Sequence, residues 1–132
     1  MGLRGPKSRP KSRHPIDAAP PAWQRPGLSR AERVCQFIES LQVTSGTLAG
    51  QRFVLRPWQR KIVESWYDCD ATGRRICRTG LLSVGRKNGK TSFAASLAAC
   101  HLLGPEAEPR GQIVVGAADR DQSGLIYEEV KA

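Results

Sequence analysis

Gly89, Lys90 and Thr91 form a Gly-Lys-Thr tripeptide of the kind that binds nucleotide phosphates. The usual phosphate-binding loop has a glycine five positions before the second glycine. This chain has Val84 at that position, and its glycine, Gly85, comes one position later. Glycines let the backbone approach phosphate oxygens, a lysine neutralises the β- and γ-phosphates, and a threonine hydroxyl coordinates Mg²⁺. The sequence therefore predicts a site for ATP and Mg²⁺ with one irregular position.

The residues on either side of this loop predict the strand and the helix that a phosphate-binding loop needs. Leu81, Leu82 and Val84 form a short apolar run typical of a buried strand. The segment "TSFAASLAACHLL" (91–103) is rich in helix-forming residues and is followed by Gly104. A phosphate loop leaves the C-terminal end of a strand and delivers its N–H groups to the start of a helix. This context favours a phosphate site over a surface turn that happens to contain a lysine.

A second strand and helix are predicted after the loop helix. The segment "GQIVVGA" (111–117) is typical of another buried strand, and residues 119–132 are predicted to form a helix that Asp119 and Gln122 cap. The order strand, loop, helix, strand, helix is typical of α/β proteins with a parallel sheet. The predicted fold class is therefore α/β: part of a P-loop NTPase, with flanking helices around a parallel sheet.

Two further helices are predicted before the loop. Ser29 stands three positions before Glu32, which is the spacing of a capping box, so a helix should begin there. Apolar residues then recur at helical spacing, at Val34, Phe37, Ile38 and Leu41. Pro57 suits the first turn of a second helix, which we expect to end near Tyr67.

The positive charge of the chain is concentrated at its N-terminus. The 21 Lys and Arg residues against 12 Asp and Glu residues give a net charge of +9. Residues 1–28 carry six basic side chains and one acidic one among many Pro, Gly and Ser residues. We predict that this segment is a disordered basic arm and that residues 29–132 form the folded part. The arm could be a solubility tail or could contact DNA phosphates weakly and without sequence preference.

The cysteines and histidines do not predict a metal centre. The four cysteines form no Cys-x-x-Cys pair, and Cys100 lies in the apolar pattern of the loop helix, as a small core residue would. Neither His14 nor His101 completes a ligand pattern with them. The sequence contains no signal peptide and no apolar run of about 18 residues, so we expect a cytoplasmic protein with reduced thiols.

Three segments resemble one family in their order and spacing. "LRPWQ", "SVGRKNGKT" and "VVGAADRDQS" closely resemble the N-terminal part of the large terminase subunit of tailed bacteriophages, the DNA-packaging motor. The resemblance runs from about Leu28 to the end of the chain. Members of that family tolerate the loss of the first glycine and commonly carry an arginine in the loop. The resemblance therefore implies an ATP-binding motor domain despite Val84.

The resemblance also implies roles for single residues. Trp58 and Gln59 match the family's adenine-recognition motif, since a glutamine amide can pair with an adenine edge. Arg86 matches the catalytic loop arginine, whose fixed charge could stabilise the γ-phosphate. The remaining positions match the loop that holds ATP phosphates and Mg²⁺, and these are Gly85, Lys87, Asn88, Gly89, Lys90 and Thr91. The alternatives are that Trp58 is a core residue and that Gln59 and Arg86 are simply solvated.

The family also implies partners: double-stranded DNA and, for the intact protein, the small terminase subunit and the portal protein, in the cytoplasm of a bacterial host. Two other classes remain open from the residues. One is another P-loop enzyme such as a helicase or a small kinase. The other is a non-catalytic nucleic-acid-binding or assembly module on a degenerate P-loop fold, which the charge of +9 favours.

One catalytic feature of the family has no match in this sequence. A P-loop motor needs an apolar strand ending in Asp-Glu to hold Mg²⁺ and orient water, and no such segment occurs. Asp119 follows an apolar run but is better placed as a helix N-cap. The family's downstream nuclease domain is also absent. We therefore expect a truncated chain that binds ATP poorly and does not hydrolyse it alone.

Overall fold

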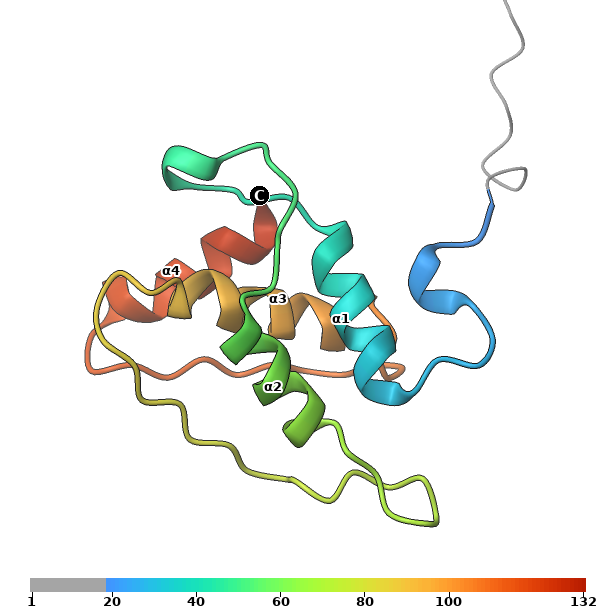
Figure 1. Ribbon diagram of the computed structural model, residues 1–132. Coiled ribbons are helices and arrows are strands. Elements are labelled where there is room, and N and C mark those ends of the chain that lie inside the picture. Colours follow the sequence, from blue (N-terminus) through green and yellow to red (C-terminus); the bar gives the residue numbers. More distant parts are fainter. Residues whose placement is uncertain (1–18) are drawn as a thin grey trace, which may run out of the picture.

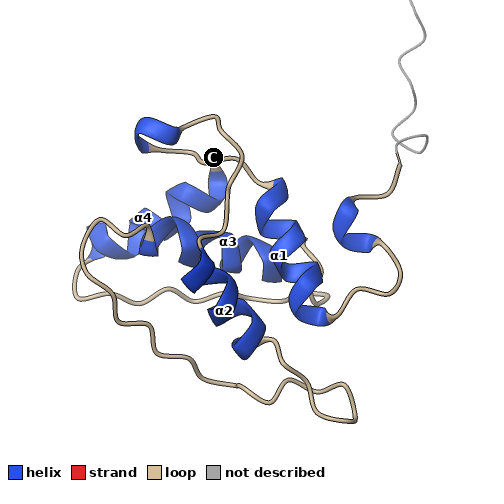
Figure 2. Ribbon diagram, viewed as in Figure 1, coloured by secondary structure: helices blue, strands red, loops and turns tan. Residues whose placement is uncertain are grey.

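The computed structural model describes residues 19–132, and its regular elements are all helices (Figures 1 and 2). The four α-helices are α1 (Arg30–Ser40), α2 (Pro57–Trp66), α3 (Lys90–Leu103) and α4 (Arg120–Lys131). Two short 3₁₀ helices, η2 (Ala22–Gln24) and η3 (Gly46–Leu48), lie before α1 and between α1 and α2. All four predicted helices are therefore present.

The predicted capping box at the start of α1 is confirmed. The Ser29 N–H donates to Glu32 Oε2 at 2.7 Å, and the Glu32 N–H donates to Ser29 Oγ at 3.2 Å. Hydrogen bonds from the Ser29 backbone N–H and from the Ser29 side chain lower the pKa of the Glu32 carboxyl, because they favour its charged form. Two N–H groups that the first turn would otherwise leave unpaired are satisfied in this way.

Pro57 begins α2, as its fixed φ predicts. The residue before it, Arg56, has its N–H satisfied by Gln59 Oε1 at 2.8 Å. A tight loop precedes this helix: Gln42 and Arg52 form an antiparallel bridge, and the Phe53 N–H donates to the Leu41 carbonyl at 2.9 Å. Residues 41–53, called the hairpin loop below, thus fold back on themselves around η3.

The core lies where α1, α2 and α3 meet. Helix α3 packs against α4 and α1, and α1 packs against α2 (Figure 1). Phe93 of α3 is completely buried at the centre of this packing. The core side chains with no exposed surface at all are Phe93, Ile38, Val34, Val63 and Cys100. Burial of this apolar surface holds α3 in place.

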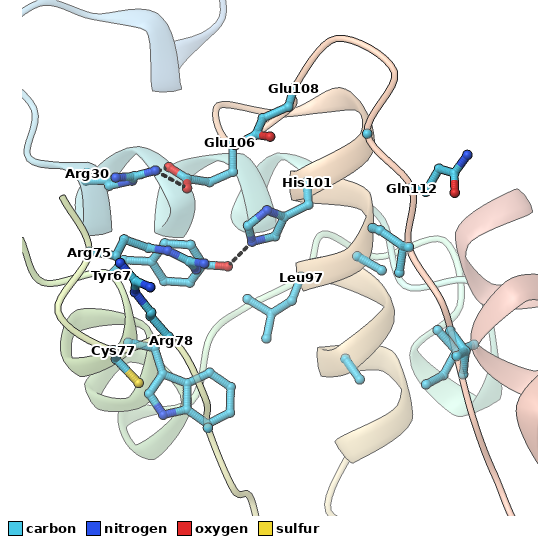
Figure 3. Close-up of a pocket in the computed structure, with 18 residues that line it drawn as sticks. Arg30, Tyr67, Arg75, Cys77, Arg78, Leu97, His101, Glu106, Glu108 and Gln112 are labelled. Atoms are coloured by element: carbon cyan, nitrogen blue, oxygen red, sulfur yellow. Dashed lines mark hydrogen bonds and ion pairs between the residues drawn. The ribbon is translucent and has the colours of Figure 1, made fainter.

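The predicted parallel sheet is not formed among residues 19–132, so this part of the expected fold is not confirmed. The segments predicted as strands, 81–84 and 111–117, lack regular structure, and no backbone hydrogen bond joins them. A cavity of about 580 Å³ beside α3 is lined by residues of segments 75–80 and 111–115, with Leu97 of α3 and Gln112 on its walls (Figure 3). Strand structure requires a hydrogen-bonded neighbour. Without one, Leu81 and Val114 are 94% and 91% exposed.

The predicted basic arm falls partly outside the described residues, since residues 1–18 are not described. Its remaining part, residues 19–28, contains η2. The Trp23 ring packs edge-on against Phe37 of α1, with 5.6 Å between ring centroids. This end of the predicted arm is therefore in contact with the helical core.

The environment of the cysteines agrees with a packing role. Cys35 and Cys100 are buried, and burial raises the pKa of their thiols to about 11 and about 12. The prediction that Cys100 is a small core residue is confirmed. In the described part of the chain, no three His, Cys, Asp or Glu side chains gather as a metal site would require. None of the helices described for residues 19–132 is long and apolar enough to cross a membrane.

A polar cluster joins α1, α2 and α3 at one end of the core (Figure 3). Arg30 forms a two-pronged ion pair with Glu106, with both distances 2.8 Å. The Tyr67 hydroxyl and His101 Nε2 are hydrogen-bonded at 2.8 Å. Burial is the main cause that lowers the pKa of His101, while Glu106 acts in the opposite direction and Arg75 in the same direction. His101 is thus favoured in its neutral form, which can accept a hydrogen bond from the hydroxyl.

The lowered pKa of His101 predicts a loss of stability in mild acid. The unfolded chain, with a histidine pKa near 6.5, binds more protons than the folded chain below that value. The free energy of unfolding should therefore decrease as the pH falls through 6.5. Well above pH 6.5, His101 should add no pH dependence to it. Urea unfolding of wild type and His101→Gln, at about pH 7.5 and about pH 5.5, measures this. An equally steep pH dependence in the variant would contradict the assignment.

Candidate functional site

The phosphate-binding loop lies directly before α3. Residues 85–89 form a tight turn, and α3 begins at Lys90. Gly89 is the residue that precedes the helix, and its φ of 73° and ψ of 26° place it in the left-handed region. Glycine adopts this conformation without a steric penalty, whereas a Cβ there costs roughly 1 kcal/mol. The second glycine of the motif is thus required by the backbone.

The position of the missing glycine makes no such demand. In the loop, positive φ values occur at Lys87 (64°) and Gly89 (73°), and Val84 is not among the residues with positive φ. A valine therefore fits at position 84 without backbone strain. Gly85 has a different role, since a Cβ on it would lie 3.3 Å from Asn88 Nδ2. The Asn88 side chain folds back over Gly85 and donates to its carbonyl at 3.4 Å.

Lys90 connects the two ends of the loop. Its ammonium group donates to the Val84 carbonyl at 2.6 Å. An ammonium group has three N–H donors, so two remain for a ligand. The side chain therefore lies over the loop, on the side of the turn where the predicted strand ends.

The start of α3 suits an anion. The first turn of a helix has unpaired N–H groups and carries a partial positive charge. Gly89 offers no side chain to cap them, and the first turn of α3 contains no acidic residue. Arg86 and Lys87 add two further positive charges within the loop. These features fit phosphate groups, which a helix N-terminus of this kind binds.

A cavity of about 420 Å³ adjoins the loop, and this is within the range of small-molecule sites. Its walls come from three segments: the hairpin loop, the start of α2, and the phosphate-binding loop. Lys87, Asn88 and Gly89 line one side, and Gln59 lines another. Gln59, predicted to recognise adenine, therefore shares a cavity with the predicted phosphate loop.

Gln59 is held in a fixed orientation. Only 3% of its surface is exposed, and its Oε1 accepts a hydrogen bond from the Arg56 N–H at 2.8 Å. The NH₂ end of the amide is then the end that can donate to an acceptor on a ligand. Adenine presents ring nitrogens as such acceptors.

The remaining predicted site residues do not line this cavity. Trp58 is half-buried and packs edge-on against Phe93, with 5.9 Å between ring centroids. Trp58 therefore packs against the core residue Phe93, and its role in adenine recognition stays a prediction. Arg86 is exposed in the turn, and Thr91 is exposed in the first turn of α3. Both are next to the loop backbone and accessible to a ligand bound there.

Asp119 caps a helix. Its Oδ1 accepts a hydrogen bond from the Gln122 N–H at 2.8 Å, and α4 begins at the next residue. The predicted N-cap is confirmed. Since this oxygen is used locally, the structure gives Asp119 no contact with the loop.

Sequence reasoning missed the hairpin loop as a wall of the cavity. Residues Ser45, Gly46, Thr47 and Leu48 line it, opposite the phosphate-binding loop. In the sequence, Gly46 and Gly50 follow the apolar helical pattern of residues 34–41 and interrupt it. Both have positive φ, at 79° and 81°, and so form the turn that brings this segment to the cavity. Two glycines four residues apart were the available signal.

Comparisons with known proteins decide the family. The family model for the terminase large subunit, ATPase domain, matches residues 57–132. The large terminase subunit of Enterobacteria phage HK97 is 40% identical over 101 residues, which are 76% of this chain. The chain belongs to the terminase large subunit family. The crystal structure of the HK97 bacteriophage large terminase superposes with a TM-score of 0.67 and 36% identity, and the match covers 79% of this chain.

This terminase chain spans about a fifth of the length of its HK97 relatives. The matched region is 19% of the curated HK97 protein and 20% of the chain in the HK97 crystal structure. The family match includes α2, the phosphate-binding loop, α3 and α4. The family that was predicted from the residues around the loop is therefore confirmed. The chain is part of a terminase ATPase domain.

Restoring the missing glycine should not improve this terminase loop. Val84 is half-buried and needs no positive φ. Val84→Gly should therefore lower the free energy of unfolding by about 1–2 kcal/mol, through lost apolar burial and a more flexible unfolded chain. Val114→Gly, at a 91% exposed valine, is the matched control and should cost about 0.5–1 kcal/mol. Urea unfolding measures both. Higher stability in Val84→Gly, or tighter binding of an ATP analogue, would show that Val84 strains the loop.

Proposed function

We propose that the chain binds ATP with Mg²⁺ in the cavity between the hairpin loop and the start of α3. One observation carries this proposal: Gln59 and the loop residues Lys87, Asn88 and Gly89 line the same cavity. ATP has a flat aromatic base with polar edges at one end and a triphosphate at the other. The cavity offers a buried amide at one wall and a basic loop at another.

The phosphates are assigned to the loop. The N–H groups at the start of α3 follow Gly89 at one end of the loop, and the ammonium group of Lys90 lies against the Val84 carbonyl at the other end. In this arrangement Thr91 supplies the hydroxyl for Mg²⁺, and Arg86 supplies a mobile positive charge for the γ-phosphate. Bound Mg²⁺ neutralises phosphate charge during phosphoryl transfer.

The base is assigned to the wall formed by Gln59. The hydrogen bond from the Arg56 N–H holds the amide so that its NH₂ group is left to donate. A base bound there would lie against η3 of the hairpin loop. The site therefore favours adenine, whose ring nitrogens accept hydrogen bonds.

The wider activity is proposed from the family. In this proposal the nucleotide site powers packaging of double-stranded DNA, in the cytoplasm of a bacterial host, with the small terminase subunit and the portal protein as partners. Segments 81–84 and 111–117 are proposed to become strands of a parallel P-loop sheet when neighbouring strands are supplied. The exposed side chains of Leu81 and Val114 support this, because both faces of a parallel sheet are normally covered and apolar side chains on them are buried.

Lys90→Ala tests the nucleotide site directly. The ammonium group is expected to make charge-assisted hydrogen bonds to phosphate, and loss of such bonds costs about 1.5–3 kcal/mol. The dissociation constant for a fluorescent ATP analogue with Mg²⁺ should therefore rise by roughly 10- to 100-fold. Lys61→Ala, at an exposed lysine of α2, is the matched control and should bind like wild type.

The fold must be monitored at the same time, because Lys90 also binds the Val84 carbonyl. Urea unfolding of Lys90→Ala separates a loss of affinity from a loss of structure. Equal affinity of wild type and a folded Lys90→Ala variant would remove the phosphate-loop assignment.

A further inference from the structure

The turn between α2 and the phosphate-binding loop is held in one conformation by a single carboxylate. Asp70 Oδ1 accepts hydrogen bonds from the Thr72 N–H at 2.8 Å, the Thr72 hydroxyl at 2.6 Å and the Arg74 N–H at 3.0 Å. The hydrogen bonds from Thr72 and Arg74 lower the pKa of Asp70. Cys69 and Arg75 close the turn with an antiparallel bridge. The turn therefore has a defined conformation, although Asp70 itself is exposed.

Four arginines gather around this turn. Arg30, Arg74, Arg75 and Arg78, together with Gly73, line a hollow of about 390 Å³, called the arginine pocket below. Figure 3 shows Arg30, Arg75 and Arg78 at one end of the larger cavity beside α3. Arg30 Nη1 donates to the Gly73 carbonyl at 3.4 Å. The arginines thus come from two segments more than forty positions apart that the fold brings together.

Two of these arginines are fixed by neighbours. Arg30 is paired with Glu106, and the hydrogen bond to this carboxylate raises the pKa of Arg30 above its ordinary value. The Arg75 guanidinium lies over the Tyr67 ring, 5.2 Å from its centroid. Such stacking holds the guanidinium plane and leaves its N–H edge free to donate. Arg74 and Arg78 are exposed.

Arg74, Arg75 and Arg78 of the pocket have guanidinium groups that form no ion pair in the described part of the chain. Glu106 balances Arg30, and an Asp70 oxygen is used by donors within the turn. Asp68 and Glu108 are the other carboxylates of the adjacent segments. Across residues 19–132, neither they nor any other carboxylate forms an ion pair with Arg74, Arg75 or Arg78. Three guanidinium groups around one small hollow, with no ion pair to a carboxylate of residues 19–132, can donate hydrogen bonds to an anion.

We propose that the arginine pocket binds phosphates of the DNA backbone. Guanidinium groups match phosphate oxygens with two parallel hydrogen bonds, so several arginines around one hollow suit a phosphodiester. The turn has no helix or strand that could enter a groove, which implies backbone contacts without base recognition. None of the pocket residues lines the nucleotide cavity, so the two sites are separate. The choice of DNA over other phosphate ligands rests on the proposed packaging function.

The double variant Arg74→Gln/Arg78→Gln tests the pocket while sparing Arg30 and Arg75, which have structural contacts. Binding of a labelled DNA duplex is measured by fluorescence anisotropy over a range of salt concentrations. Loss of two phosphate contacts should weaken binding and reduce the slope of log K against log salt by about 2. The matched control, Arg33→Gln/Lys61→Gln, removes the same charge at two exposed positions on α1 and α2 and should keep the slope within about 0.5 of wild type.

Equal loss of slope in the two double variants would overturn the proposal, because net charge alone would then explain DNA binding. Arg74→Lys/Arg78→Lys keeps the charge but removes the two-pronged geometry, and it should fall between wild type and the Gln variant. Wild-type binding by this Lys variant would also contradict a guanidinium site. Urea unfolding of each variant shows that the fold is intact.

Binding of the ATP analogue separates this proposal from the nucleotide site. Arg74→Gln/Arg78→Gln should bind the analogue like wild type, whereas Lys90→Ala should not bind it well. DNA binding that survives in Lys90→Ala but falls in the arginine variant supports two sites. Loss of DNA binding in Lys90→Ala alone, with the arginine variant unchanged, would place the DNA phosphates at the loop and overturn the arginine pocket.

Discussion

The burial of α3 is the constraint on which the site depends. Phe93 and Cys100 are completely buried on this helix, so its position against α1 is fixed by the core. Lys90, the first residue of α3, is three positions before Phe93. The loop therefore gains its position from a helix that is anchored in the core. A phosphate site needs N–H groups that are already oriented before the ligand arrives, because orienting them afterwards costs affinity. Attaching the loop to a buried helix meets this need.

The opposite wall of the cavity is tied to the same helix by a longer route. The hairpin loop carries Thr44 and Ser45, whose hydroxyls donate to the Glu129 carboxylate of α4. Helix α4 in turn packs along α3. Two of the three walls of the nucleotide cavity thus depend on α3. The phosphate-binding loop depends on it directly, and the hairpin loop depends on it through α4. The wall of α2 depends on the core through Val63, which is fully buried. Changes in the packing of α3 should therefore alter the whole cavity and not the loop alone.

The helices were predictable from the sequence because their signals are local. Ser29 with Glu32, Pro57, and Asp119 with Gln122 each act within one turn, and each is confirmed. The predicted sheet is not confirmed in the described part of the chain, because a strand is not a local structure and needs a hydrogen-bonded neighbour. The apolar runs at 81–84 and 113–115 satisfy the local pattern, but no backbone hydrogen bond joins either run to a neighbouring strand. The loop was placed correctly before α3, whereas the cavity could not be foreseen. The shape of the cavity depends on how residues 45–48 lie relative to Gln59, and no spacing in the sequence determines that arrangement.

The central claim is that the loop and Gln59 form one nucleotide site. An NMR titration of the chain with ATP and Mg²⁺ tests it most directly, by following the backbone amides of Gly89 and Lys90 and the side-chain NH₂ of Gln59. The account predicts that all these resonances shift with the same dissociation constant and that inorganic triphosphate shifts the loop amides but not Gln59. Shifts of the loop amides by ATP with no change at Gln59 would show that the base lies elsewhere. That result would contradict a shared cavity.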